Sequence, residues 1–146
     1  METFYEWFLV LYEDTGINLP FLYDDYDRGR ILNGLWATIK LSATCVLFSV
    51  IIGMVGAWLQ GSPWKLTRRV VNFYVQLFRN TPPLVQLYFF YFAVGILIPR
   101  VENGWGGTSP LIDSFGWAVI SLSFFAGAFN VEIFRSGIEA VPKSTI

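Results

Sequence analysis

The side chains best suited to chemistry form a polar series in the middle of the sequence. Asn72, Gln76, Arg79, Pro83 and Gln86 follow one another at intervals of four, three, four and three residues, so a continuous helix would carry them on one face. An arginine at the centre of a bilayer costs about 2.5–3.5 kcal/mol on insertion scales, and less toward an edge. In a membrane such a face lines water, a partner helix or the path of a polar substrate rather than lipid.

The composition excludes the commonest enzymatic chemistries. The 146 residues include no histidine, which removes the most frequent acid–base group and metal ligand. The single cysteine, Cys45, excludes an intrachain disulfide and any Cys-rich zinc or iron–sulfur site. The net charge of −1 gives no basic surface for nucleic acid. An intramembrane enzyme would need a nucleophile with its base, or a set of metal ligands, and the apolar segments provide neither.

The elements that must position the polar series are membrane helices. Hydrophobic residues make up 54% of the chain and charged residues 14%, against about a quarter in an ordinary soluble domain. Three windows carry no charge: 41–64, 80–99 and 114–131. Each is close to the length of about 20 residues that crosses a hydrocarbon core, where only helices satisfy the backbone within one segment. We expect an all-α membrane protein with spans near 35–59, 78–98 and 114–134.

The distribution of basic residues predicts the orientation of these spans. The link between the first two spans holds Lys65, Arg68 and Arg69 without an acid, and Arg135 and Lys143 follow the third span. Basic residues in short loops stay in the cytoplasm, so both segments are expected there, with Ile146. The first 34 residues hold seven acidic and two basic residues and are expected to be an extracytoplasmic segment. Within it, the aromatic and apolar stretch 4–11 predicts a short helix lying at the membrane interface.

Small residues predict where the helices approach one another. Cys45, Ser49, Gly53 and Ala57 recur at intervals of four in the first span, and Gly127 belongs to a similar run in the third. Such stripes let helices associate closely in lipid, so these five residues are expected to form a packing surface.

The polar series also contains helix-breaking residues. Pro82 and Pro83 remove two backbone donors and predict a kinked or unwound helix beside Arg79. A second interpretation of Arg79 places it at the cytosolic headgroups. At the end of the third span, Glu132 and Arg135 are three residues apart and are expected to pair on one helix face, with a gating contact to a second subunit as the alternative.

Three blocks of the sequence resemble one family. They are Ile31–Ser42 (ILNGLWATIKLS), Tyr74–Leu87 (YVQLFRNTPPLVQL) and Val131–Lys143 (VEIFRSGIEAVPK). In this order they are similar to the membrane-spanning permease subunit of bacterial ATP-binding-cassette importers for polar amino acids. Gln76, Asn80 and Pro83 depart from the glutamate, glycine and aliphatic residue usual in that family.

The resemblance implies a fold and a set of partners. It implies a five-span type I permease, of which residues 35–146 would be the first three spans, ending before the Glu-Ala-Ala coupling loop. It further implies alternating access, a second permease subunit, cytoplasmic ATPase subunits that hold ATP and magnesium, and an external binding protein. This chain would then be no enzyme, would carry no cofactor and would lie in the bacterial inner membrane.

The same resemblance directs attention to particular residues and substrates. The expected substrate-pathway residues are Gln76, Arg79, Asn80, Thr81, Gln86, Asn130 and Glu132. Glutamate, glutamine or aspartate is the expected substrate, on the resemblance alone. A structural or anchor subunit of a membrane complex stays the alternative, since it would need the small-residue stripes but not the polar face.

Overall fold

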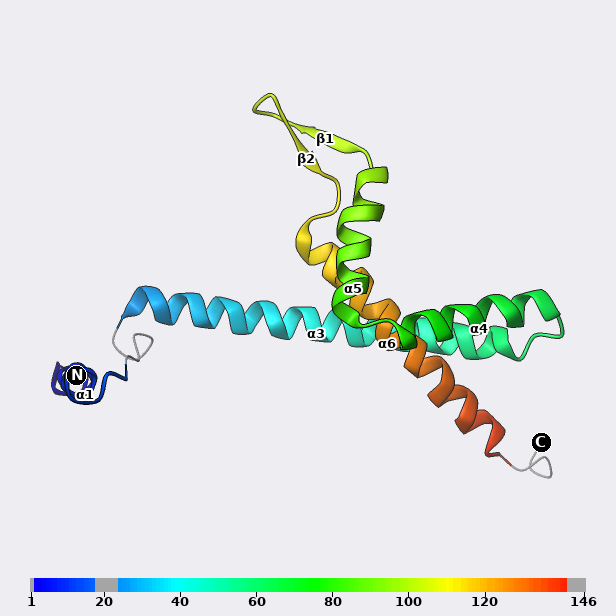
Figure 1. Cartoon of the computed structure of the whole chain (residues 1–146), viewed down its shortest axis with the longest axis horizontal. Helices are drawn as coiled ribbons and strands as arrows, with labels where there is room; N and C mark the ends of the chain where they lie inside the picture. Colours follow the sequence, from blue (N-terminus) through cyan, green and yellow to red (C-terminus); the bar gives the residue numbers. More distant parts are fainter. Residues whose placement is uncertain (1, 18–23, 142–146) are drawn as a thin grey trace. The chain divides into compact units, whose positions relative to one another are not determined.

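The structure is a computed structural model that describes residues 2–17 and 24–141. The chain divides into two compact units, residues 1–40 and 41–146, which are described separately. The elements along the chain (Figure 1) are α1 (Glu2–Thr15), α3 (Asp25–Gln60), α4 (Lys65–Asn80), α5 (Pro83–Tyr88), the π-helical η1 (Phe89–Val94), the 3₁₀-helical η2 (Gly95–Leu97), β1 (Arg100–Asn103), β2 (Gly107–Pro110) and α6 (Ser114–Glu139).

The first unit contains α1 and the start of α3. The expected helix is present at the amino-terminal end, and Trp7 and Val10 on it are exposed. Its location at a membrane interface stays a prediction. The start of α3 is fixed by Asp24, whose Oδ1 accepts a hydrogen bond from the Tyr26 amide at 2.9 Å.

Two helices are long and apolar enough to cross a membrane, by length and composition, among the residues that the structure describes. They are α3, with 36 residues, and α6, with 26 residues, and they contain the expected spans 35–59 and 114–134. The expected middle span, 78–98, is not one helix. Its apolar helical part runs only from Pro83 to Leu97. At about 1.5 Å per residue this part falls short of a hydrocarbon core of about 30 Å.

The middle segment is interrupted where the prolines predict it. Helix α4 ends at Asn80, and Thr81 is extended, with φ −108° and ψ 130°. Proline disfavours helical backbone in the residue before it, so Thr81 and Pro82 both leave the helical region. Pro83 then starts α5 in the first helical turn, where a missing N–H breaks no intrahelical bond.

The expectation of an all-α chain is wrong in one place. Strands β1 and β2 form an antiparallel hairpin in which Arg100 pairs with Pro110 and Asn103 with Gly107. The turn requires glycine, because Gly106 has φ +75°. Its amide donates a hydrogen bond of 3.1 Å to the Asn103 carbonyl. The glycine-rich segment between the second and third expected spans thus forms the turn of a hairpin.

Within the second unit, α4 and α5 pack against α6. Val71, Val75 and Val131 form the buried cluster between α4 and α6. Figure 1 shows α4 alongside the carboxyl-terminal end of α3, where Gln60 Nε2 donates to Asn72 Oδ1 at 2.8 Å. Many large apolar side chains stay exposed. Apolar surface on this scale is typical of a chain that contacts lipid or partner subunits.

Candidate functional site at the break between α4 and α5

An ion pair joins the end of α4 to α6. Arg79, in the last turn of α4, donates through Nη1 to Glu132 Oε2, and its guanidinium lies 5.3 Å from the centre of the Phe129 ring. The two side chains are 40% and 46% exposed, so the pair is open on one side. The structure therefore brings together two expected pathway residues that are 53 positions apart in the sequence.

The expected pairing of Glu132 with Arg135 is wrong. Arg135 Nε instead donates to Glu139 Oε1 at 2.8 Å, one turn further along α6. The physical reason is that α4 brings a second arginine against α6, and the spacing within α6 cannot reveal that contact. Arg135 then finds its own partner at the i,i+4 spacing that helices favour.

Gln86 holds the broken helix together from inside. It is 6% exposed, and its Nε2 donates to the carbonyls of Phe78 and Thr81, both at 2.7 Å. The Phe78 carbonyl would normally accept the amide of residue 82, but that residue is a proline without an N–H. Gln86 therefore replaces the hydrogen bond that Pro82 removes. This contact makes Gln86 a structural residue of the break rather than a side chain facing open space.

The polar series does not form one continuous face, contrary to expectation, because the helix is interrupted after Asn80. Asn72 accepts a hydrogen bond from Gln60 on α3, while Gln76 and Asn80 are exposed on α4. The Thr81 hydroxyl donates to the Leu77 carbonyl at 2.7 Å within its own turn. Of the series, only Arg79 reaches a charged partner among the described residues.

The small residues lie where α3 meets α6. Cys45, Ser49, Gly53 and Ala57 are all buried on α3. The Asn130 amide donates to Ser49 Oγ at 3.1 Å, so this expected pathway residue is part of the same seam.

Two glycines show how tightly the seam is packed. A methyl group at Gly53 would collide with Asn130 of α6, and one at Gly127 would lie 2.7 Å from Ile52 Cγ2. Close approach of the backbones thus depends on these glycines. Gly56, which we did not single out from the sequence, would likewise collide with Val131.

An aromatic cluster surrounds the break and was missed from the sequence. Phe78 lies with its ring centre 5.7 Å from that of Phe124 on α6 and 6.2 Å from that of Phe90 on η1. Tyr74 packs on Phe78 at 4.9 Å and donates its hydroxyl to the Phe124 carbonyl at 2.6 Å. Of these contacts, only that between Tyr74 and Phe78 could have been predicted from the sequence, because the two residues are four apart on one helix. The cluster joins α4, η1 and α6 next to the break.

These features define a class of protein: an integral membrane component with close-packed apolar helices and a broken helix that carries a charged pair. Residues 49–146 match the family of the binding-protein-dependent transport system inner membrane component. The chain belongs to this family, as the three sequence blocks predicted.

Curated relatives agree with the family assignment. The chain is 33% identical over 118 residues to the histidine/lysine/arginine/ornithine transport system permease protein HisQ of Salmonella typhimurium, a match covering 81% of this chain and 52% of HisQ. It is 34% identical over 113 residues to the putative glutamine transport system permease protein GlnP of Rickettsia felis, covering 77% of this chain and 47% of GlnP. The chain thus spans about half the length of the curated relatives it matches.

A solved structure has a similar arrangement. The crystal structure of an amino acid ABC transporter with histidines matches with a TM-score of 0.69 and 28% sequence identity, over 88% of this chain and 55% of that one. The family is that of the inner-membrane component rather than the ATPase. The expectations of a non-enzymatic inner-membrane chain without its own cofactor are confirmed by that membership.

Proposed function

We propose that this chain is a permease component of an ATP-driven importer of polar amino acids and forms half of an alternating-access pathway. The family membership supports this proposal, as do the relatives, whose printed names concern amino acids. The observation that carries it is the half-exposed pair of Arg79 and Glu132 beside the broken helix.

The pair is chemically suited to a polar amino acid. It offers one guanidinium and one carboxylate, which match the carboxylate and ammonium groups of an amino acid without adding net charge. An arginine binds a carboxylate through two parallel hydrogen bonds. A substrate can therefore exchange with the pair, its carboxylate taking the place of Glu132 and its ammonium that of Arg79. Glutamate, glutamine and aspartate are the substrates we would test first, with basic amino acids as competitors.

The proposed assembly follows the family. We propose cytoplasmic ATPase subunits, a second permease subunit and an external binding protein as partners. In the membrane, residues 1–34 would be extracytoplasmic with α1 at the interface, and the carboxyl end would be cytoplasmic. The segment 78–98 would be a third, interrupted span of a five-span type I fold, with residues 35–146 in the membrane domain. Orientation can be tested by labelling single cysteines placed in the 61–64 and 103–107 turns of a Cys45→Ser background.

The function is tested by uptake of labelled amino acids in the complete transport system. Arg79→Gln and Glu132→Gln should each lower the initial uptake rate about tenfold or more, while the protein still inserts in the membrane. Arg135→Gln is the matched control, because it also removes an arginine from an exposed ion pair, one that lies away from the break. Uptake by Arg79→Gln equal to that of Arg135→Gln would contradict the proposed pathway role.

The alternative of a structural or anchor subunit has less support. Its main argument is the stripe of small residues, which could bind a helix of another protein. In this chain the stripe is buried against α6 of the same chain, where Ser49 and Gly53 both meet Asn130. It is therefore not available as an anchoring surface.

A further inference from the structure

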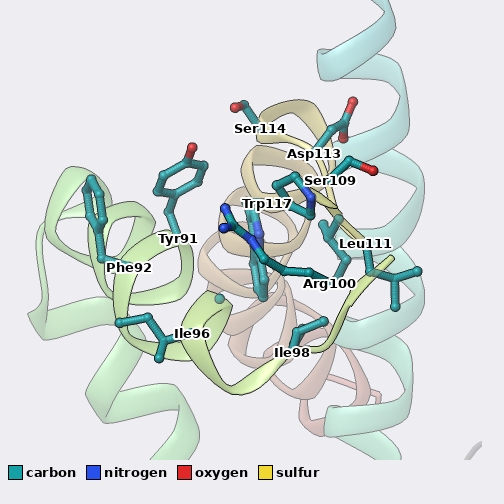
Figure 2. A pocket seen from close by; sticks show the side chains of 13 residues that line it. Tyr91, Phe92, Ile96, Ile98, Arg100, Ser109, Leu111, Asp113, Ser114 and Trp117 are labelled. Carbon is teal, nitrogen blue, oxygen red and sulfur yellow. The ribbon is translucent and has the colours of Figure 1, made fainter. Parts of the chain in front are cut away.

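A cavity lies at the opposite end of the middle segment from Arg79. Its volume is about 670 Å³, and it is lined by residues of η1, η2, the hairpin and the first turn of α6. Figure 2 shows Tyr91 on one side, Trp117 at the back and Arg100 crossing the opening. None of the expected pathway residues lines this cavity.

Arg100 is the functional group of the cavity. Figure 2 shows its guanidinium directed into the space between Tyr91 and Trp117. Among the described residues, no carboxylate lies within ion-pair distance of Arg100. Asp113 stands at the rim beside Ser114, and its Oδ1 is occupied as the cap of α6, accepting from the Gly116 amide at 2.7 Å. The cavity thus presents a cation that its own lining leaves without an ionic partner.

The position of the cavity indicates what kind of anion can reach Arg100. The hairpin connects the end of the apolar segment Pro83–Leu97 to the start of the apolar helix α6, so the cavity lies where both leave the apolar layer. Tyrosine and tryptophan are enriched at that level of a membrane. Ile96 lines the cavity and is 82% exposed, so it offers an apolar surface at the edge of the cavity. A charged group next to an exposed apolar surface matches the two chemical parts of a phospholipid.

We propose that this cavity binds a phospholipid headgroup, with Arg100 holding the phosphate and the acyl chains lying along Phe92 and Ile96. The guanidinium fork binds two phosphate oxygens in parallel, a geometry that lysine cannot reproduce. Trp117, which is buried, forms the floor on which the headgroup rests. The site rests on the membrane location of the chain and not on its transport activity.

The test is calorimetric titration of the detergent-solubilised protein with three probes: short-chain phosphatidylglycerol, a diglyceride with the same two acyl chains, and inorganic phosphate. We expect saturable binding of phosphatidylglycerol and at least about tenfold weaker binding of the two other probes, because the diglyceride lacks the phosphate headgroup and inorganic phosphate lacks the acyl chains. Equal affinity for the diglyceride would overturn the role of Arg100, and equal affinity for inorganic phosphate would replace the lipid site by a site for free anions.

Variants distinguish lipid binding in the cavity from nonspecific attraction between an anionic lipid and any positive charge of the protein. Arg100→Gln should weaken phosphatidylglycerol binding about tenfold, and Arg100→Lys should weaken it less. Arg69→Gln is the matched control, since it removes the same charge from an exposed position on α4. An equal loss in Arg100→Gln and Arg69→Gln, with both proteins eluting as wild type in gel filtration, would overturn the proposal.

Discussion

Replacing Gln86 by methionine tests whether the break between α4 and α5 is held by one side chain. The change keeps the length of the side chain and removes two hydrogen bonds of 2.7 Å to the carbonyls of Phe78 and Thr81. Leaving a buried acceptor without a partner costs about 1–3 kcal/mol. The change also removes the buried Oε1 of Gln86, for which the described residues provide no hydrogen-bond partner. Two carbonyls lose their partner, and the removal of Oε1 offsets about one such cost, so we expect a net loss of about 1–3 kcal/mol.

Thermal unfolding of the detergent-solubilised protein measures this loss as a lower Tm. Gln76→Met is the matched control, because it makes the same chemical change at an exposed position of α4 and should leave Tm unchanged. Pro82→Ala gives a sharper test, because it restores the N–H whose absence leaves the Phe78 carbonyl without a backbone partner. In the Pro82→Ala background, Gln86→Met should lower the free energy of unfolding by less than it does in the wild type. A double-mutant cycle would measure this difference. Equal Tm values for Gln86→Met and Gln76→Met would refute the proposed role of Gln86.

Three further predictions concern the contacts around the same region. Gly53→Ala should lower Tm strongly by forcing α3 away from α6, whereas Gly34→Ala, where an added Cβ meets nothing within 4 Å, should not. Exchanging the charges of Arg79 and Glu132 in a double variant should recover part of the stability that either single reversal loses, as thermal unfolding would detect; no recovery would show that the pair contributes nothing. Tyr74→Phe should lower the free energy of unfolding by about 0.5–1.5 kcal/mol through loss of the hydrogen bond to Phe124, and an unchanged value would contradict that bond.

The sequence predicted the parts of the fold that depend on local chemistry. The two long apolar helices follow from the absence of charge over a sufficient length, and the interruption follows from Pro82 and Pro83. The hairpin was missed, because a short glycine-rich segment between apolar stretches is equally compatible with a hairpin and with an open loop. The pairing of Arg100 with Pro110 depends on the backbone geometry of the turn. The residue types are compatible with that geometry but do not determine it.

The contact between Arg79 and Glu132 could not be predicted from the sequence, and their role in a pathway stays a prediction. Arg79 and Glu132 both belong to the expected set, yet each was expected to act without the other. Their contact depends on α4 packing against α6, which is a property of the tertiary structure. The same holds for Phe129 beneath the guanidinium, since nothing in its spacing from Arg79 indicates a contact. Local spacing can suggest a partner within one helix, as it did wrongly for Arg135, and cannot weigh that partner against one from another helix.

The two prolines leave a backbone acceptor on the same residue that forms the ion pair. Pro82 and Pro83 deprive two successive carbonyls, those of Phe78 and Arg79, of the amides that would normally pair with them in a helix. Gln86 pairs with the first of these carbonyls, and a continued helix has no donor for the second. A backbone acceptor of this kind is tolerated at membrane depth only where it is buried in protein or borders water. The side chain of Arg79, on the same residue, extends from this position to Glu132, so the backbone acceptor and the ion pair place polar groups together beside the Phe129 ring.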